Sequence, residues 1–298
     1  MNRRRVINYL TTLSFLLPAL LLVGVFIVWP TVETLRLSFY SDEGFVGLRN
    51  FQDILSSRST LNLERFPGST PPWGSLVHNA VWILVHLPVT VILGIILAVL
   101  FSKVQGWWVN VIKMTIFLGM VTPLVVGGVI IRFLFDRGAG VVPATAAALG
   151  LDNFAKTWTA YPDTALLALI IGSIWLWTGF SMVLHSAGLS TIDRELYEAA
   201  ELDGANEWHK FWMITIPLLW PVTAVVIALT VLWELKIFDI VYVATMGGPG
   251  GSSMVLALQM YILGFRELNP YSAATVATLL TVLSLPVGIW IARRSLRG

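Results

Sequence analysis

Long runs of apolar residues alternate with shorter polar connections along this chain. Six runs, at 10–29, 75–101, 109–135, 164–187, 212–235 and 273–292, are each long enough to cross the roughly 30 Å of hydrocarbon in a bilayer. Backbone N–H and C=O groups cannot stay unpaired in lipid, so each run must be a helix. We therefore predict an all-α, polytopic membrane protein with six transmembrane helices in a single domain, residues 1–298.

The first run has a competing interpretation. It follows Arg3, Arg4 and Arg5, and a signal peptide would also combine a basic head with an apolar body. The run is about as long as a membrane span, however, and no small-x-small cleavage motif closes it. We interpret it as a retained first span.

Composition supports a membrane environment. The chain is 56% hydrophobic and only 12% charged, whereas soluble domains contain about 25% charged residues. The net charge of +2 gives no indication of a nucleic-acid partner, and we expect lipid instead. Because there is no cysteine, disulfides, thiolate catalysis and Cys-based metal sites are excluded.

Basic residues predict the orientation. An even number of spans places both termini on one side, and cytoplasmic segments carry an excess of Lys and Arg. The clusters that decide the orientation are Arg3, Arg4 and Arg5 at the start and Arg293, Arg294 and Arg297 at the end. Both termini and the connections 102–108 and 188–211 are therefore predicted to be cytoplasmic, and the connections 30–74, 136–163 and 236–272 to face outward.

Motifs that would indicate an enzyme are missing from the sequence. It contains no G-x-x-x-x-G-K-[ST] phosphate loop, no H-E-x-x-H and no nucleophile elbow, and its four histidines are scattered, which gives no metal pair. Transport, channel and scaffold functions remain.

Charged residues near the end of the fifth run have two interpretations. Glu234 and Asp239 flank Lys236, beside Trp233 and Phe238. They either mark a helix end that emerges into water or line a polar cavity with aromatic walls, which would suit a ligand such as a sugar. The sequence leaves both open.

The segment 191–211 is unusually rich in charge. Acidic residues near its start suit a helix N-terminus, which Thr191 or Asp193 could cap. Gly204 then fits the left-handed position that ends a helix, and Asn206 could cap a second helix from Glu207. The helical spacing places Leu196, Ala199, Ala200 and Asp203 on one face. Physical reasoning leaves open a surface helix–Gly–helix that contacts a partner and a solvated amphipathic loop.

Glu198-Ala199-Ala200, followed by Gly204, Ile214 and Ile216-Pro217, resembles the EAA motif in permease subunits of binding-protein-dependent ABC importers. Ile216 stands where the family more often has Leu, and Asp193 where it has Pro. The segments FVGLRNF at 45–51, TMGGP at 245–249 and NPYSAA at 269–274 also resemble segments of the sugar permeases, in the same order. The likeness covers nearly the whole chain and is greatest to the maltose-type carbohydrate permeases of bacterial or archaeal cytoplasmic membranes.

The resemblance implies a multi-subunit machine. A second permease would complete the pathway, two ABC ATPase subunits would bind ATP and Mg²⁺ on the cytoplasmic side, and an extracytoplasmic binding protein would deliver the sugar. This chain itself would hold no cofactor. The coupling helix that contacts the ATPase would comprise Glu198, Ala199, Ala200, Asp203 and Gly204.

Carried over by position, the family's sugar pathway falls on six residues, Trp177, Phe180, Thr230, Trp233, Glu234 and Ile237. The last four are spaced so that they share one helix face. The cargo is expected to be a di- or oligosaccharide, with a glycerol-phosphate-like compound or another small polyol as the alternative. An ion-coupled secondary transporter would need inverted repeats and a mid-span acidic relay, and neither is visible. A scaffold would not need the EAA motif.

Overall fold

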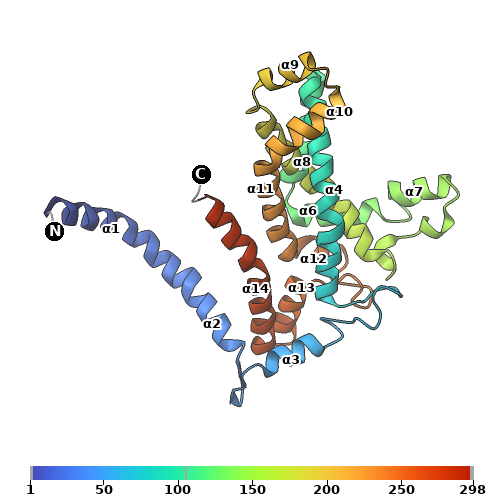
Figure 1. Ribbon diagram of the computed structural model, residues 1–298. Helices are drawn as coiled ribbons and strands as arrows, with labels where there is room; N and C mark the ends of the chain where they lie inside the picture. The colour runs from blue at the N-terminus through green and yellow to red at the C-terminus, as the bar shows by residue number, and fades with distance from the viewer. Residues whose placement is uncertain (1–2, 105, 296–298) are drawn as a thin grey trace. The chain divides into compact units, whose positions relative to one another are not determined.

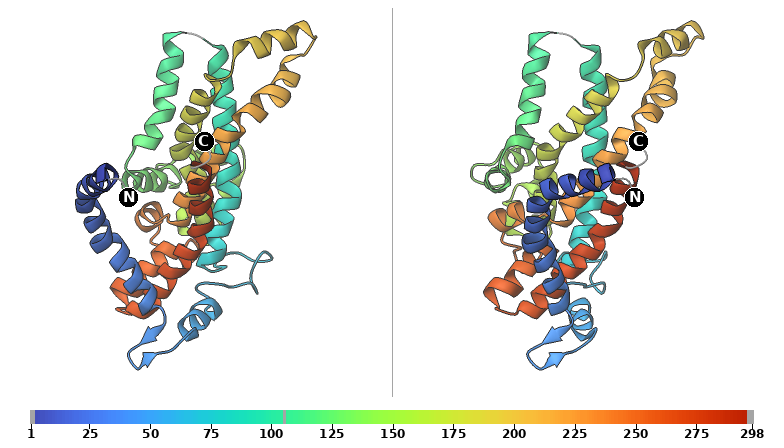
Figure 2. Two further views of the ribbon diagram at one scale, coloured as in Figure 1. Left: turned by 60° about the vertical axis from the view of Figure 1, so that its left-hand side comes forward. Right: turned by 90° about the vertical axis from the view of Figure 1, so that its left-hand side faces the viewer.

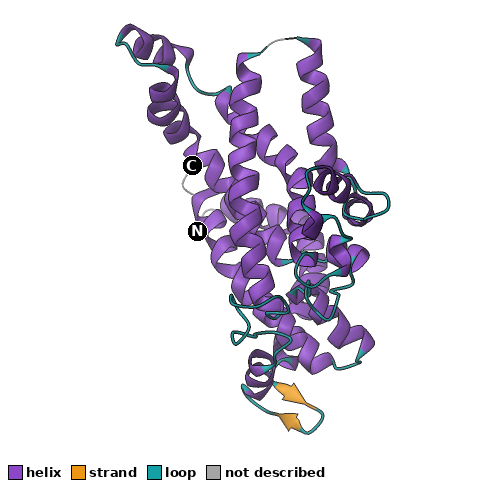
Figure 3. Cartoon of the chain, turned by 90° about the vertical axis from the view of Figure 1, so that its right-hand side faces the viewer, coloured by secondary structure: helices purple, strands orange, loops and turns teal. Residues whose placement is uncertain are grey.

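Helices account for nearly all of the secondary structure. The computed structural model describes residues 3–104 and 106–295, so Arg297, which contributed to the predicted orientation, lies outside the described residues (Figure 1). Within these ranges the only strands form one hairpin of two-residue strands (Figure 3). The elements are α1 (Arg3–Val23), α2 (Trp29–Leu37), β1 (Tyr40–Ser41), β2 (Gly44–Phe45), α3 (Arg49–Ser56), α4 (Ser75–Lys103), α5 (Trp107–Val121), α6 (Leu124–Leu134), α7 (Val141–Ala148), α8 (Ala165–Leu189), α9 (Arg194–Leu202), α10 (Glu207–Lys210), α11 (Ile216–Leu235), α12 (Asp239–Ala244), α13 (Leu256–Tyr261) and α14 (Pro270–Ser295).

Five helical stretches of the described chain are long and apolar enough to cross a membrane, and a bent pair brings the number to six. The five are Leu13–Leu37, Ser75–Lys103, Ala165–Leu189, Glu207–Leu235 and Pro270–Arg294. π-helical turns at Gly24–Val28 and Phe211–Thr215 continue α1 into α2 and α10 into α11 without a break. The prediction of an all-α, polytopic membrane protein is confirmed.

The span predicted at 109–135 is not one straight helix. The structure has α5 and α6 there, bent by 108° at a break after Val121. Pro123 supplies no backbone N–H, and its ring disfavours a helical conformation for the residue before it. Thr122 is accordingly extended, with φ −66° and ψ 125°.

The chain divides into two compact units. The first comprises Met1–Leu55 with Met260–Leu279, and the second comprises Ser56–Gln259 with Leu280–Gly298. In the first unit, the most apolar window of Leu13–Leu37 has no buried residue. Arg36 pairs with Glu33 at 2.5 Å one helical turn away, and the side-chain amide of Asn50 on α3 donates to the carbonyl of Tyr40 in the hairpin (2.8 Å).

In the second unit, α8 is the central helix and packs against α4, α5, α6 and α11. Its most apolar window is 72% buried, compared with 28% for α4. Small residues allow this close approach, as is common between membrane helices. A Cβ added to Gly94 of α4 would lie 2.0 Å from Oγ of Ser181 on α8, and one added to Gly179 would lie 2.7 Å from the carbonyl oxygen of Ile116 on α5.

Both short connections predicted to be cytoplasmic lie at one end of this second unit. Figure 2 shows the end of α4 and the start of α5 at the same end as α9 and α10. The two connections are therefore positioned to face the same side of a membrane.

Candidate functional site

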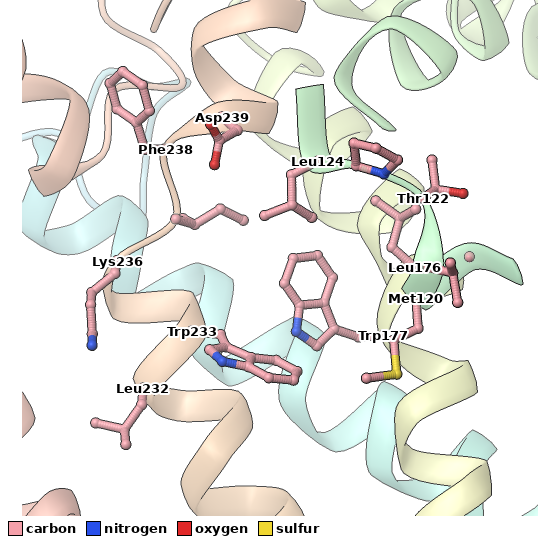
Figure 4. Close-up of a pocket in the computed structure, with 14 residues that line it drawn as sticks. Met120, Thr122, Leu124, Leu176, Trp177, Leu232, Trp233, Lys236, Phe238 and Asp239 are labelled. Atoms are coloured by element: carbon pink, nitrogen blue, oxygen red, sulfur yellow. The ribbon is translucent and has the colours of Figure 1, made fainter. Parts of the chain in front are cut away.

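An aromatic cavity of about 470 Å³ lies where the α5–α6 break meets α8 and the end of α11 (Figure 4). Its lining comes from three places in the sequence that the fold brings together. They are the break (Gly119, Met120, Val121, Thr122, Pro123 and Leu124), α8 (Leu176 and Trp177), and α11 with the turn into α12 (Leu232, Trp233, Lys236, Ile237, Phe238 and Asp239). The bend at Pro123 is thus what supplies one wall of the cavity.

Two indoles form the aromatic wall. The ring centroids of Trp177 and Trp233 are 6.1 Å apart with an interplanar angle of 61°, and Figure 4 shows the two side chains next to each other. Phe180, which is outside the lining, packs on Trp233 with 4.8 Å between the ring centroids. Lys236 and Asp239 add one positive and one negative side chain to the lining.

The six predicted pathway residues separate into two groups. Trp177, Trp233 and Ile237 line the cavity, and Phe180 supports it. Thr230 and Glu234 are buried away from the cavity lining. Neither interpretation holds for Glu234, which is only 1% exposed and does not line the cavity, whereas Lys236 and Asp239 beside it do line the cavity.

Glu234 is paired with a residue that sequence reasoning missed. Nδ1 of His86 on α4 lies 2.5 Å from Oε1 of Glu234, and both side chains are 1% exposed. Asn79, also on α4, donates to the backbone carbonyl of Glu234 (3.0 Å) and accepts from the backbone N–H of Leu256 (2.9 Å). A buried acid in a membrane helix requires a partner, and that requirement was the only available signal for His86.

The pair belongs to a group of five buried side chains with unpaired polar atoms, which we call the polar seam. Its members lie on α4, α8 and α11, and each has a buried polar atom without a hydrogen-bond partner among the described residues: Nε1 of Trp82, Nε2 of His86, Nε1 of Trp177, Oγ1 of Thr230 and Oε2 of Glu234. Trp177 belongs to both the seam and the cavity lining, and its ring meets His86 edge-on at 5.5 Å. Since unsatisfied buried polar groups are costly, the seam offers hydrogen bonds to any polar group that reaches it.

At the other end of the unit, the segment 191–211 folds as a helix–Gly–helix. α9 ends at Leu202, and Gly204 takes the left-handed conformation (φ +83°). Oδ1 of Asn206 accepts from the backbone N–H of His209 (2.9 Å) and so caps α10. Asp193 occupies the N-cap position of α9 without making a capping hydrogen bond. The local helix–Gly–helix prediction is confirmed.

The predicted coupling residues lie mainly on the exposed side of this segment. Glu198, Ala199, Asp203 and Gly204 are exposed and Ala200 is half-buried. Glu198 pairs with Arg194 one turn away (2.9 Å), where both side chains remain in solvent. Leu196 and Leu202 of α9 expose 46% and 91% of their surface, so the helix presents apolar as well as charged groups.

Side chains that commonly bind metal ions are dispersed over the described residues. Within residues 3–104 and 106–295, no group of three or more His, Cys, Asp or Glu side chains is placed to hold a metal ion. Neither the cavity nor the helix–Gly–helix segment brings such groups together.

Comparison with known proteins identifies the family. Residues 90–296 match the family "Binding-protein-dependent transport system inner membrane component". The chain is 54% identical to a probable ABC transporter permease of Pyrococcus horikoshii over 96% of this chain and 98% of the relative. It is 32% identical to the lactose transport system permease LacF of Rhizobium radiobacter over 92% and 89%.

The fold agrees with this assignment. A crystallised bacterial ABC transporter involved in the import of the acidic polysaccharide alginate contains a chain that superposes with a TM-score of 0.77 at 20% identity, covering 99% of this chain and 98% of that one. This chain therefore belongs to the inner-membrane permeases of binding-protein-dependent ABC importers, a family of transport subunits and not of enzymes.

Proposed function

We propose that this permease carries a sugar, a di- or oligosaccharide, across the cytoplasmic membrane. The observation that carries the proposal is the cavity walled by Trp177 and Trp233. Indole faces pack against the C–H faces of a sugar ring, while a few polar groups fix its hydroxyls. Lys236 and Asp239 in the lining, and the adjoining polar seam, supply such groups. The size of the cavity lies within the roughly 300–1,000 Å³ typical of small-molecule sites.

The charges near the cavity favour a neutral cargo over a glycerol-phosphate-like one. Lys236 is the single cation in the lining, and Asp239 lies in the same lining. Phosphate recognition usually employs several cationic or backbone N–H donors. A small polyol remains the second candidate, but it would leave the paired aromatic surface largely unused. The lactose permease relative is consistent with a sugar.

We infer that the other subunits of the importer, and the orientation of this chain, follow the family arrangement. Both termini and α9 face the cytoplasm, where α9 contacts one of two ABC ATPase subunits that bind ATP and Mg²⁺. A second permease completes the pathway, and an extracytoplasmic binding protein delivers the sugar. The exposed apolar and charged groups of α9 support a contact with a soluble partner. Membership of this family leaves an ion-coupled mechanism without support.

Uptake by the complete importer in proteoliposomes tests the cargo. ATP-dependent uptake of labelled maltose, trehalose and lactose is compared with that of sorbitol and glycerol 3-phosphate, and at least one sugar should be taken up fastest. Trp233→Ala should then raise the half-saturating sugar concentration about tenfold, equivalent to about 1.4 kcal/mol. Trp220→Ala is the matched control, because Trp220 lies on the same helix with 57% of its surface exposed. Preferred uptake of glycerol 3-phosphate, or equal effects of the two substitutions, would contradict the proposal.

A further inference from the structure

Four charged side chains form a network beside α9. Nζ of Lys210 lies 2.5 Å from Oε1 of Glu201 on α9 and also pairs with Glu207 at the start of α10. Glu207 in turn pairs with Lys103, the last residue of α4. The order Glu201–Lys210–Glu207–Lys103 alternates in sign, so each inner member bridges two oppositely charged neighbours. The network thereby joins α9, α10 and α4.

Lys210 is the enclosed member of this network. Its side chain is 8% exposed, whereas those of Glu201, Glu207 and Lys103 are 61%, 63% and 54% exposed. Its two carboxylate partners come from different helices, so its position depends on both. The hydroxyls of Tyr197 on α9 and Thr215 lie 3.0 Å apart and give a second, uncharged contact between α9 and the helix that carries Lys210.

That helix leads directly to the cavity. α10, the π-helical turn and α11 are one continuous helix from Glu207 to Leu235. Lys210 lies near its first turn and Trp233 near its last, about 35 Å apart at 1.5 Å per residue. This continuity provides a direct covalent and hydrogen-bonded connection between Lys210 and the cavity wall at Trp233.

α4 is joined to the same helix at two points. Lys103 pairs with Glu207 at one end, and His86 pairs with Glu234 near the cavity. The two helices therefore form a braced pair. α9 is attached to this pair through Glu201 and Lys210 and through the Tyr197–Thr215 contact.

We propose that Lys210 is a positioning residue that joins α9 to the braced pair of α4 and α10–α11, so that movement of α9 reaches the cavity. The inference rests on the proposed function in one respect, that α9 is the segment on which the ATPase acts. It assigns to Lys210 and Glu201 a role in transmission that is distinct from contact with the ATPase, because Lys210 is enclosed within this chain.

Lys210→Met tests the inference in the complete importer, with Lys210→Arg as the conservative variant. Two quantities are measured in proteoliposomes, ATP hydrolysis and the uptake of the labelled sugar that the wild-type importer takes up from the panel of maltose, trehalose and lactose. Lys210→Met should lower the sugar moved per ATP hydrolysed about tenfold in a complex that still assembles and hydrolyses ATP. Lys210→Arg should keep most of the wild-type ratio of sugar moved per ATP hydrolysed. Lys156→Met is the control, since Lys156 also forms a 2.5 Å pair, with Asp163, remote in sequence from α9.

A distance measurement separates this inference from the identity of the cargo. The chain has no cysteine, so Glu195→Cys on α9 and Ser102→Cys on α4 provide the only two thiols of this chain for spin labels. The wild type and Lys210→Arg should give one narrow distance distribution, and Lys210→Met a broad one. Should Lys210→Met fail to assemble, Glu201→Gln removes the same link to α9 and should show the same broadening.

Two results would overturn the inference: unchanged sugar moved per ATP in Lys210→Met, or an unchanged label distribution in Lys210→Met or Glu201→Gln. Failure of the proposed function would appear differently, as a wild-type complex that hydrolyses ATP and takes up no sugar of the panel. In that case the label distribution still decides whether Lys210 holds α9 to the braced pair.

Discussion

Two clusters of ionisable side chains join α4 to the continuous helix α10–α11, and they are built in opposite ways. The His86–Glu234 pair is sealed from solvent and keeps unpaired atoms on both partners. The network of Lys103, Glu207, Lys210 and Glu201 is largely open to solvent, and every member has a partner of opposite charge. The same two helices are thus held by one buried pair near the cavity and by one exposed pair, Lys103–Glu207, beside α9.

The difference follows from the surrounding medium. A charge within the membrane domain is expensive unless it is paired, and removing one partner leaves the other uncompensated. Exposed ion pairs are individually weak because water competes for both partners. We therefore expect substitutions at the cavity end to affect stability, and substitutions at the α9 end to affect coupling with little loss of stability.

The largest effect on stability is expected for His86→Ala, which removes one partner of the buried pair. Glu234 would be left buried without its partner, a loss of about 3–5 kcal/mol, and the melting temperature of the detergent-purified complex should fall. Glu234→Gln keeps an oxygen that can accept a hydrogen bond from His86 and should cost less. A melting temperature of His86→Ala equal to that of the wild type would show that the pair does not hold the helices.

Glu198→Ala tests whether the exposed side of α9 couples ATP hydrolysis to sugar uptake. Glu198 lies on the exposed side of α9 and pairs only with Arg194 among the described residues. The importer should therefore assemble and keep its melting temperature, while sugar uptake falls about tenfold relative to ATP hydrolysis. Parallel assays of assembly, ATP hydrolysis and uptake provide the check. Unchanged uptake would count against α9 as the coupling helix.

The smallest effect is expected for Lys103→Met, although Lys103 joins the same two helices as His86. Its side chain is 54% exposed, and the Glu207 that it contacts keeps Lys210 as a second partner. The loss of stability should stay below about 1 kcal/mol. Thermal denaturation of His86→Ala, Lys103→Met and wild type measures the loss of stability of each variant. Equal losses of stability in the two variants would contradict the expected difference between the buried and the exposed pair.

Local patterns predicted much of this molecule. Spans could be read from apolar runs because lipid forces the backbone of each run into a helix. The helix–Gly–helix segment was equally local, since Gly204 and Asn206 act on residues within one turn. The span predicted at 109–135 gave no indication of the 108° bend beside Pro123, where the break lines one cavity together with residues of α8 and α11.

Contacts between residues far apart in the sequence could not be predicted from it. His86 and Glu234 are 148 positions apart, and no local pattern pairs them. Spacing placed Thr230, Trp233, Glu234 and Ile237 on one helix face. In the structure this face has two parts. Trp233 and Ile237 line the cavity, and Thr230 and Glu234 are buried outside its lining. Residue spacing alone does not reveal where a helix face is divided between two neighbours.

Passage of the cargo through the cavity between the α5–α6 break, α8 and α11 can be tested directly at Thr122. Thr122 lines the cavity and is half-buried, so in this cysteine-free chain Thr122→Cys places a single thiol there. During ATP-driven uptake by the complete importer, the transported sugar should slow the reaction of this thiol with a water-soluble reagent, while sorbitol should not. A thiol at Lys156→Cys, away from the cavity lining, should react at the same rate with and without the sugar. Equal reaction rates at Thr122→Cys in the presence and absence of transported sugar would contradict the account.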